Sequence, residues 1–176
     1  MKCLVVYSSV TGNTRSLAEA IHTVMPPGTN IIPVYKAPAP DGFDFLALGF
    51  WVHRAKPDPR MIRYMRGVQN KTVAWFGTLA AWPDSEHAHQ VRRNTEELLC
   101  GNRVAGGFLC QGRLEARLFA AAMNRSSTEG KHPLTEERKA KLLEAALHPN
   151  KADFVAAREQ FSLFLRQCGS PRKSIP

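Results

Sequence analysis

The chain has 176 residues, of which 44% are hydrophobic and 22% are charged, as in soluble globular proteins. We expect a single domain over residues 1–168 and a frayed tail at 169–176. No apolar run approaches the length of a membrane span, and the first residues lack the pattern of a signal peptide. The composition therefore predicts a cytoplasmic protein without membrane contact.

The formal net charge of +9 allows several kinds of anionic partner. Arg60, Arg63 and Arg66 recur every three residues, which predicts a basic stripe along one helix surface. No RNA-binding, zinc-finger or helix-turn-helix signature accompanies the charge, so we expect no nucleic-acid partner. The four cysteines are scattered and form no CxxC pair, so they are interpreted as packing residues and no metal site is expected.

Strand and helix patterns alternate along the chain, which predicts a parallel sheet covered by helices on both faces. Strands are expected at 2–8, 30–35, 43–50, 72–77 and 104–110. Helices are expected at 13–25, from Asp58-Pro59 to Gly67, from 83–85 to Gly101, and over the apolar positions 154–165.

Pro33 lies inside the second expected strand, where it cannot donate to a central ladder, so this strand is predicted at an edge of the sheet. That position fits the doubly wound strand order 2-1-3-4-5. Residues 111–150 carry two helical patterns around a polar stretch at 124–132 and contain no strand pattern. We therefore expect a helical insertion between the fifth strand and the last helix, packed at one end of the sheet.

A turn rich in hydroxyl groups connects the first strand to the first helix, and its sequence is Ser8-Ser9-Val10-Thr11-Gly12-Asn13-Thr14. The first amides of a helix have no intrahelical acceptor, and the helix dipole favours an anion there. The turn matches neither the GxxxxGK[ST] nor the GxGxxG pattern. It predicts a cradle that holds a terminal phosphate monoester without transferring it, and the alternative is an ordinary capping turn.

Two further loops follow strands and end at the same edge of the sheet, and each offers a tryptophan, Trp51 or Trp82. Aromatic side chains beside a phosphate cradle can clamp a flat ring system that carries a phosphorylated chain. Each tryptophan could equally belong to the core.

These motifs resemble those of the flavodoxin family. Residues 7–14 are similar to the flavodoxin phosphate loop, and residues 49–51 and 76–84 occupy the places of its two ring-contacting loops. The resemblance covers about residues 1–110 and the last helix, and it implies a flavodoxin-like five-stranded sheet, non-covalent FMN and electron transfer. It also implies that Ser9, Thr11 and Thr14 bind the phosphate and that Trp51 and Trp82 flank the ring. The residues expected to contact FMN are Ser8, Ser9, Val10, Thr11, Gly12, Asn13, Thr14, Phe50, Trp51, Val52, His53, Thr78, Leu79, Ala80, Ala81 and Trp82.

Two features depart from the resemblance, because carrier flavodoxins are typically strongly acidic and the shortest flavodoxins lack the insertion at 111–150. The basic loop at 53–56 would stand near the ring, where a cation stabilises an anionic reduced flavin. We therefore expect a redox partner protein with an acidic docking surface, and a monomer or homodimer. The alternatives are a flavodoxin-fold NAD(P)H:quinone-type reductase, with His53, Arg54 or Arg113 binding the cosubstrate, and an interaction module without FMN.

Overall fold

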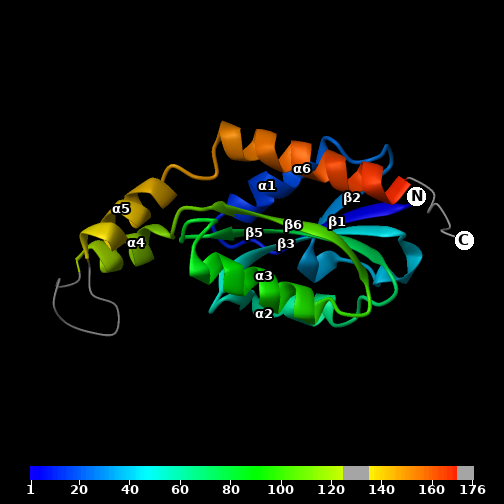
Figure 1. Ribbon diagram of the computed structural model, residues 1–176, viewed down its shortest axis with the longest axis horizontal. Helices are drawn as coiled ribbons and strands as arrows, with labels where there is room; N and C mark the ends of the chain where they lie inside the picture. The colour runs from blue at the N-terminus through cyan, green and yellow to red at the C-terminus, as the bar shows by residue number, and fades with distance from the viewer. Residues whose placement is uncertain (125–134, 170–176) are drawn as a thin grey trace, which may run out of the picture.

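The computed structural model describes residues 1–124 and 135–169. Its central sheet has five parallel strands in the order β2-β1-β3-β5-β6 (Figure 1). These strands are β1 (Cys3–Tyr7), β2 (Asn30–Pro33), β3 (Phe45–His53), β5 (Thr72–Leu79) and β6 (Arg103–Gln111). The predicted order 2-1-3-4-5 is confirmed, since β5 and β6 are the fourth and fifth parallel strands. Pro33 lies on the edge strand, as its missing N–H requires.

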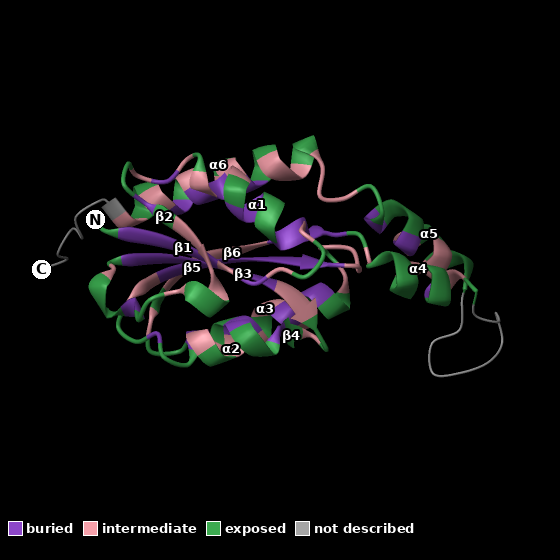
Figure 2. Ribbon diagram, turned by 180° about the vertical axis from the view of Figure 1, so that it is seen from behind, coloured by how far each residue is buried: buried purple, intermediate pink, exposed green. Residues whose placement is uncertain are grey.

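Helices cover both faces of this sheet. On one face lie α1 (Asn13–His22) and α6 (Lys151–Gly169), and on the other lie α2 (Pro59–Met65) and α3 (Glu86–Leu98) (Figures 1 and 2). The sheet therefore separates two apolar clusters. Leu17 and Phe161 belong to the first, and Met61 and Val91 belong to the second.

Two helix starts follow the expected capping chemistry. The Asp58 carboxylate accepts hydrogen bonds from the amides of Arg60 and Met61, and Ser85 accepts one from the amide of Ala88. The start of α1 differs, because it follows Gly12 in the left-handed region (φ 91°) and no side chain caps it. Its first amides are thus left without an acceptor from their own helix.

The structure differs from the sequence-based expectation at several strand ends, and β5 runs to Leu79 rather than Gly77. β2 stops at Pro33 rather than Tyr35 and is followed by the short 3₁₀ helices η1 (Val34–Lys36) and η2 (Pro40–Gly42). β3 continues beyond Phe50 to His53, because Trp51 still pairs with β5 and residues 52–53 pair with the short antiparallel strand β4 (Lys56–Pro57). The loop expected after Phe50 is therefore a β-hairpin.

The insertion between β6 and α6 forms two helices, α4 (Ala116–Met123) and α5 (Glu136–Ala145), which extend from the end of the sheet (Figure 1). This agrees with the two predicted helical patterns, although β6 includes Gln111 and shifts the start of the insertion by one residue. Residues 125–132 of the expected polar stretch and 170–176 of the expected tail lie outside the described residues. No helix in the described ranges is both long and apolar enough to cross a membrane.

Candidate functional site

The loop between β1 and α1 presents backbone donors at the carboxyl end of the sheet. The Ser8 amide donates to the carbonyl of Gly49 (2.8 Å) and holds the start of the loop against β3. The first intrahelical bond of α1 runs from the Ser16 amide to the Gly12 carbonyl (2.9 Å). The amides of residues 13–15 precede that bond, so they have no helical acceptor and lie at the positive end of the helix dipole. This arrangement can bind an anion.

The hydroxyl groups of the loop have different environments. Ser9 Oγ is buried and has no hydrogen-bond partner among the described residues, whereas Thr11 is exposed. Thr14 Oγ1 lies 2.9 Å from Thr78 Oγ1 on β5, and both residues are buried. Since either hydroxyl can donate in that pair, the other keeps its hydrogen for a further acceptor. Ser9 is thus the predicted phosphate contact that most clearly lacks a partner within the protein.

The Ser8 side chain bonds to Asp58, which the sequence indicated only as the start of a helix. Its hydroxyl donates to Asp58 Oδ1 (2.9 Å), and Asp58 is almost completely buried. Burial raises the pKa of the Asp58 carboxyl, although the hydrogen bonds from Ser8 and from two α2 amides act in the opposite direction. Asp58 therefore links the phosphate loop to the N-terminus of α2.

Asn13 connects the loop to the start of the insertion. Its Nδ2 donates to the Arg113 carbonyl (2.7 Å), and its Oδ1 is buried without a partner in the described part of the chain. Gly112 lies beside it, and a Cβ atom there would come within 2.8 Å of Asn13 Nδ2. The absence of a side chain at residue 112 thus permits this close contact.

A cleft of about 250 Å³, named here the phosphate cleft, opens at the loop and is lined in part by Ser9, Gly12, Arg15, Tyr35 and Arg60. Arg15 is paired with Glu19 at 2.8 Å, and both side chains are largely exposed. Among residues 1–124 and 135–169, no acidic side chain lines the cleft. The cleft therefore combines backbone donors with positive charge, so it suits an anion.

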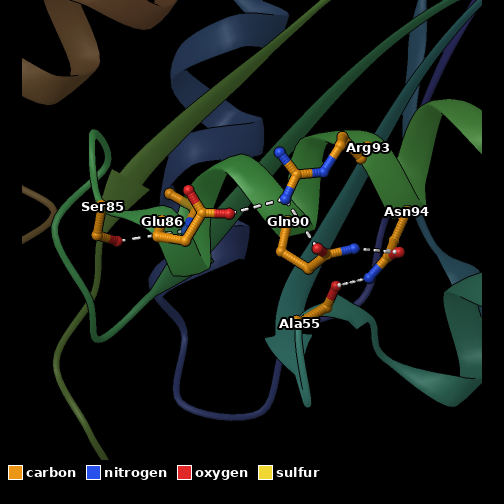
Figure 3. Close-up of polar contacts among 7 residues, drawn as sticks. Ala55, Ser85, Glu86, Gln90, Arg93 and Asn94 are labelled. Carbon is orange, nitrogen blue, oxygen red and sulfur yellow. Dashed lines mark hydrogen bonds and ion pairs between the residues drawn. The ribbon is translucent and has the colours of Figure 1, made fainter.

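The first ring loop is a hairpin held by α3. Asn94 Nδ2 donates to the Ala55 carbonyl (2.7 Å), and Gln90 Nε2 donates to Asn94 Oδ1 (2.8 Å) (Figure 3). Arg54 and Ala55 have positive φ angles of 49° and 59°, which suits a tight turn between twisted antiparallel strands. The side-chain network on α3 thus supports a strained turn next to the expected ring position.

The predicted residues of this hairpin do not all face solvent. Phe50 is fully buried and stacks on Trp75, with ring centroids 5.8 Å apart, so its side chain belongs to the core. Trp51 and Val52 are half-buried and His53 is exposed. The Trp51 and His53 rings meet edge to face, with their centroids 5.5 Å apart. Among the predicted contact residues of the hairpin, Trp51, Val52 and His53 therefore have side-chain surface available to a ligand.

The second ring loop lies against the insertion. Thr78 and Leu79 are buried, and Ala80, Ala81 and Trp82 are half-buried. Trp82 Nε1 donates to Glu144 Oε2 (2.5 Å), and the Lys141 ammonium lies 4.7 Å from the Trp82 ring centroid. Trp82, which the sequence predicts beside a cofactor ring, thus makes these contacts with α5 (Glu136–Ala145). Sequence reasoning missed both partners, because no local pattern relates them to residue 82.

A cavity of about 490 Å³, named here the ring-loop cavity, lies between this loop and α5. Its lining includes Val52, Leu79, His87, Lys141 and Leu142. It joins residues of both ring loops to a wall that the insertion supplies. The insertion is therefore part of the candidate site and not a remote appendage.

The three arginines expected in one stripe are divided between two sides of α2. Arg60 and Arg63 line a cavity beside η1, whereas Arg66 lines a different cavity that α3 borders. Residues 60 and 66 lie about 120° apart around a helix with 3.6 residues per turn, so the three arginines do not all line one cavity as a single stripe would.

Comparisons with known proteins agree with this architecture. A family model described as a flavodoxin domain matches residues 4–162. The chain is 30% identical over 125 residues to the flavodoxin-like domain-containing protein BilS of Clostridioides difficile strain CD3, covering 68% of this chain and 71% of that protein. This relative supports the family and says nothing of the reaction.

Solved structures show the same fold at low sequence identity. Oxidised flavodoxin 2 from Bacillus cereus has a TM-score of 0.61 at 16% identity, covering 95% of this chain and 99% of its own. A flavoprotein from Lactobacillus acidophilus NCFM, crystallised in complex with FMN, has a TM-score of 0.50 at 16% identity and covers 61% of this chain and 92% of its own. With the strand order, the phosphate loop and the family match together, the chain belongs to the flavodoxin domain family.

Proposed function

We propose that this flavoprotein binds FMN non-covalently at loop 8–14 and transfers electrons between a reductase or low-potential donor protein and an acceptor. The observation that carries the proposal is the buried, unpartnered Ser9 hydroxyl beside the uncapped start of α1. A buried polar group without a partner costs free energy, and an anionic oxygen would supply its acceptor. The FMN complex of the Lactobacillus acidophilus flavoprotein supports the choice of flavin.

The residues of this chain would hold the cofactor at two places. The amides of residues 13–15, Ser9 and Thr11 would bind the phosphate, and the Thr14–Thr78 pair has one hydroxyl hydrogen to add. Trp51 and the backbone near Ala80 would border the ring. FMN, when bound, supplies reversible one- and two-electron chemistry. The protein contributes binding, orientation and exclusion of water from the ring.

A second candidate is an NAD(P)H:quinone-type reductase, which the ring-loop cavity favours. Its walls combine apolar side chains with His87, Arg138 and Lys141 and with one carboxylate, Glu137, which suits a flat cosubstrate or a quinone next to a flavin. Lys141 is partly engaged, since it lies 3.8 Å from Glu137 and over Trp82. An FMN-free interaction module is the third reading, and the unpartnered donors of loop 8–14 argue against it.

Three measurements distinguish these functions. A visible absorption spectrum of the purified chain, with identification of the heat-released chromophore, tests for FMN. Steady-state oxidation of NADH or NADPH with a quinone acceptor tests the reductase reading. If the chain contains FMN and shows negligible NAD(P)H turnover, the result supports the electron carrier over the reductase. If the chain does not bind FMN, the result contradicts the proposal.

A further inference from the structure

A second cavity, of about 790 Å³ and named here the α2 groove, lies directly beside the phosphate cleft. The two share the lining residues Val34, Tyr35 and Arg60, so a continuous depression runs from loop 8–14 along α2. Its volume falls in the range of roughly 300–1,000 Å³ that is typical of small-molecule sites. Apart from these three shared residues, the lining of the groove lies outside the proposed flavin site.

The groove carries positive charge without compensating carboxylates. Arg60 and Arg63 are exposed, and neither forms an ion pair within 4.0 Å with a carboxylate of the described residues. In the part of the chain that the structure describes, no acidic residue lines the groove. Guanidinium groups bind phosphate oxygens in a bidentate geometry, so two of them three residues apart on one helix suit a phosphorylated ligand.

The remaining walls are aromatic and proline-rich. Tyr35 is 70% exposed, and the Lys36 ammonium lies over its ring, 5.9 Å from the centroid. The opposite ring face is left for a flat partner, beside a further positive charge. Tyr64 donates from its hydroxyl to the Pro38 carbonyl (3.0 Å) and thereby ties α2 to the opposite wall. Burial raises the pKa of Tyr64 to about 12, so this hydroxyl stays protonated at neutral pH. The Pro38 carbonyl accepts from the Tyr64 hydroxyl and the Pro40 carbonyl accepts from the Phe43 amide, and each keeps a second lone pair for a donor such as the exocyclic amine of adenine.

We propose that the α2 groove binds an adenine nucleotide, with its base against Tyr35 and the proline wall and its phosphates on Arg60 and Arg63. The proposal rests on the proposed function, because the groove begins where the flavin phosphate would lie. Two kinds of ligand carry this adenine nucleotide. It is either the adenylate half of a flavin dinucleotide bound in place of FMN, or a free nucleotide bound beside FMN.

The test uses the full chain and three charge or ring variants. In the first arm, the flavin-free chain is titrated with FMN and with FAD, and tryptophan fluorescence reports binding. If the source is the dinucleotide, FAD binds about tenfold more tightly than FMN, and Arg63→Glu or Tyr35→Ala reduces that ratio to about one. In the second arm, calorimetry measures ADP binding to the FMN-loaded chain, and Arg63→Glu weakens it about tenfold if the source is a free nucleotide.

Arg66→Glu is the matched control, since it makes the same charge change on the same helix but faces a different cavity. Arg66→Glu should leave both the FAD-to-FMN affinity ratio and the affinity for ADP unchanged. FMN binding without any preference for FAD and without ADP binding would overturn the groove proposal and leave the proposed function intact. Equal effects of Arg63→Glu and Arg66→Glu would also overturn it, because they would indicate only the net charge. Failure to bind any flavin would instead refute the proposed function, and the ADP arm on the unloaded chain would still decide on the groove.

Discussion

Replacing Ser9 by alanine separates cofactor binding from folding, because the two should respond in opposite directions. The Ser9 hydroxyl is buried and has no partner among the described residues, so in the flavin-free chain its removal takes away an unsatisfied polar group. The free energy of unfolding of that chain should stay constant or rise slightly. With FMN, the same hydroxyl would donate to a charged phosphate, a bond worth about 1.5–3 kcal/mol. Its loss should therefore weaken FMN by roughly 10- to 150-fold.

The assay is a fluorescence titration of the flavin-free chain with FMN and riboflavin, together with urea unfolding of the same preparation. Riboflavin lacks the phosphate, so Ser9→Ala should leave its affinity unchanged. Thr11→Ala is the comparison for an exposed hydroxyl and should give a smaller loss of FMN affinity. An equal loss for FMN and riboflavin, or unchanged FMN binding in Ser9→Ala, would refute the assignment of this hydroxyl to the phosphate.

Four further predictions follow from other contacts. Gly12→Val should abolish FMN binding because valine strains the left-handed turn. Gly28→Val, at a similar φ of 83° with open space, should lower stability but leave FMN binding intact. Equal FMN affinities of the two variants in a titration would contradict this prediction. Since the pKa of Asp58 is raised, the folded chain holds this proton to a higher pH than the unfolded chain, so ionisation of Asp58 lowers stability as pH rises from about 4 through the raised pKa. Asp58→Asn should remove this pH dependence from the free energy of unfolding, measured with urea across a pH series. Superimposable pH profiles of the two proteins would exclude a contribution from Asp58. Trp82→Ala should speed hydrogen exchange in α5, since the indole contacts that helix, and unchanged exchange would show that the contact adds no stability. Electron transfer with an acidic partner should slow as ionic strength rises, and Arg63→Glu should slow it further at low salt; rates that are flat in both proteins would leave the charge without a steering role.

Local sequence patterns predicted the architecture well, because each depends on residues close together in the chain. Pro33 indicated an edge strand, and the observed sheet places it there. Asp58-Pro59 indicated a helix start, and Asp58 caps α2 through two amides. Patterns failed where a strand is apolar on both faces, since Phe50 and Trp51 look alike in sequence although one is in the core and the other is half-buried. Strand alternation alone could not separate them.

The sequence by itself determined where loop 8–14 lies and at which end of its strand it opens, because a strand, a turn with a left-handed glycine and a helix start are all local features. Only the tertiary structure decided which of its hydroxyls are available. Ser8 bonds to Asp58 from 50 residues away and Thr14 bonds to Thr78 from 64 residues away, whereas Ser9 meets no partner among the described residues. The same holds for Trp82, whose partner Glu144 is 62 residues distant. Such pairs exist only once parallel strands bring their carboxyl ends to one edge of the sheet and the insertion packs beside it, and no short-range periodicity encodes that juxtaposition.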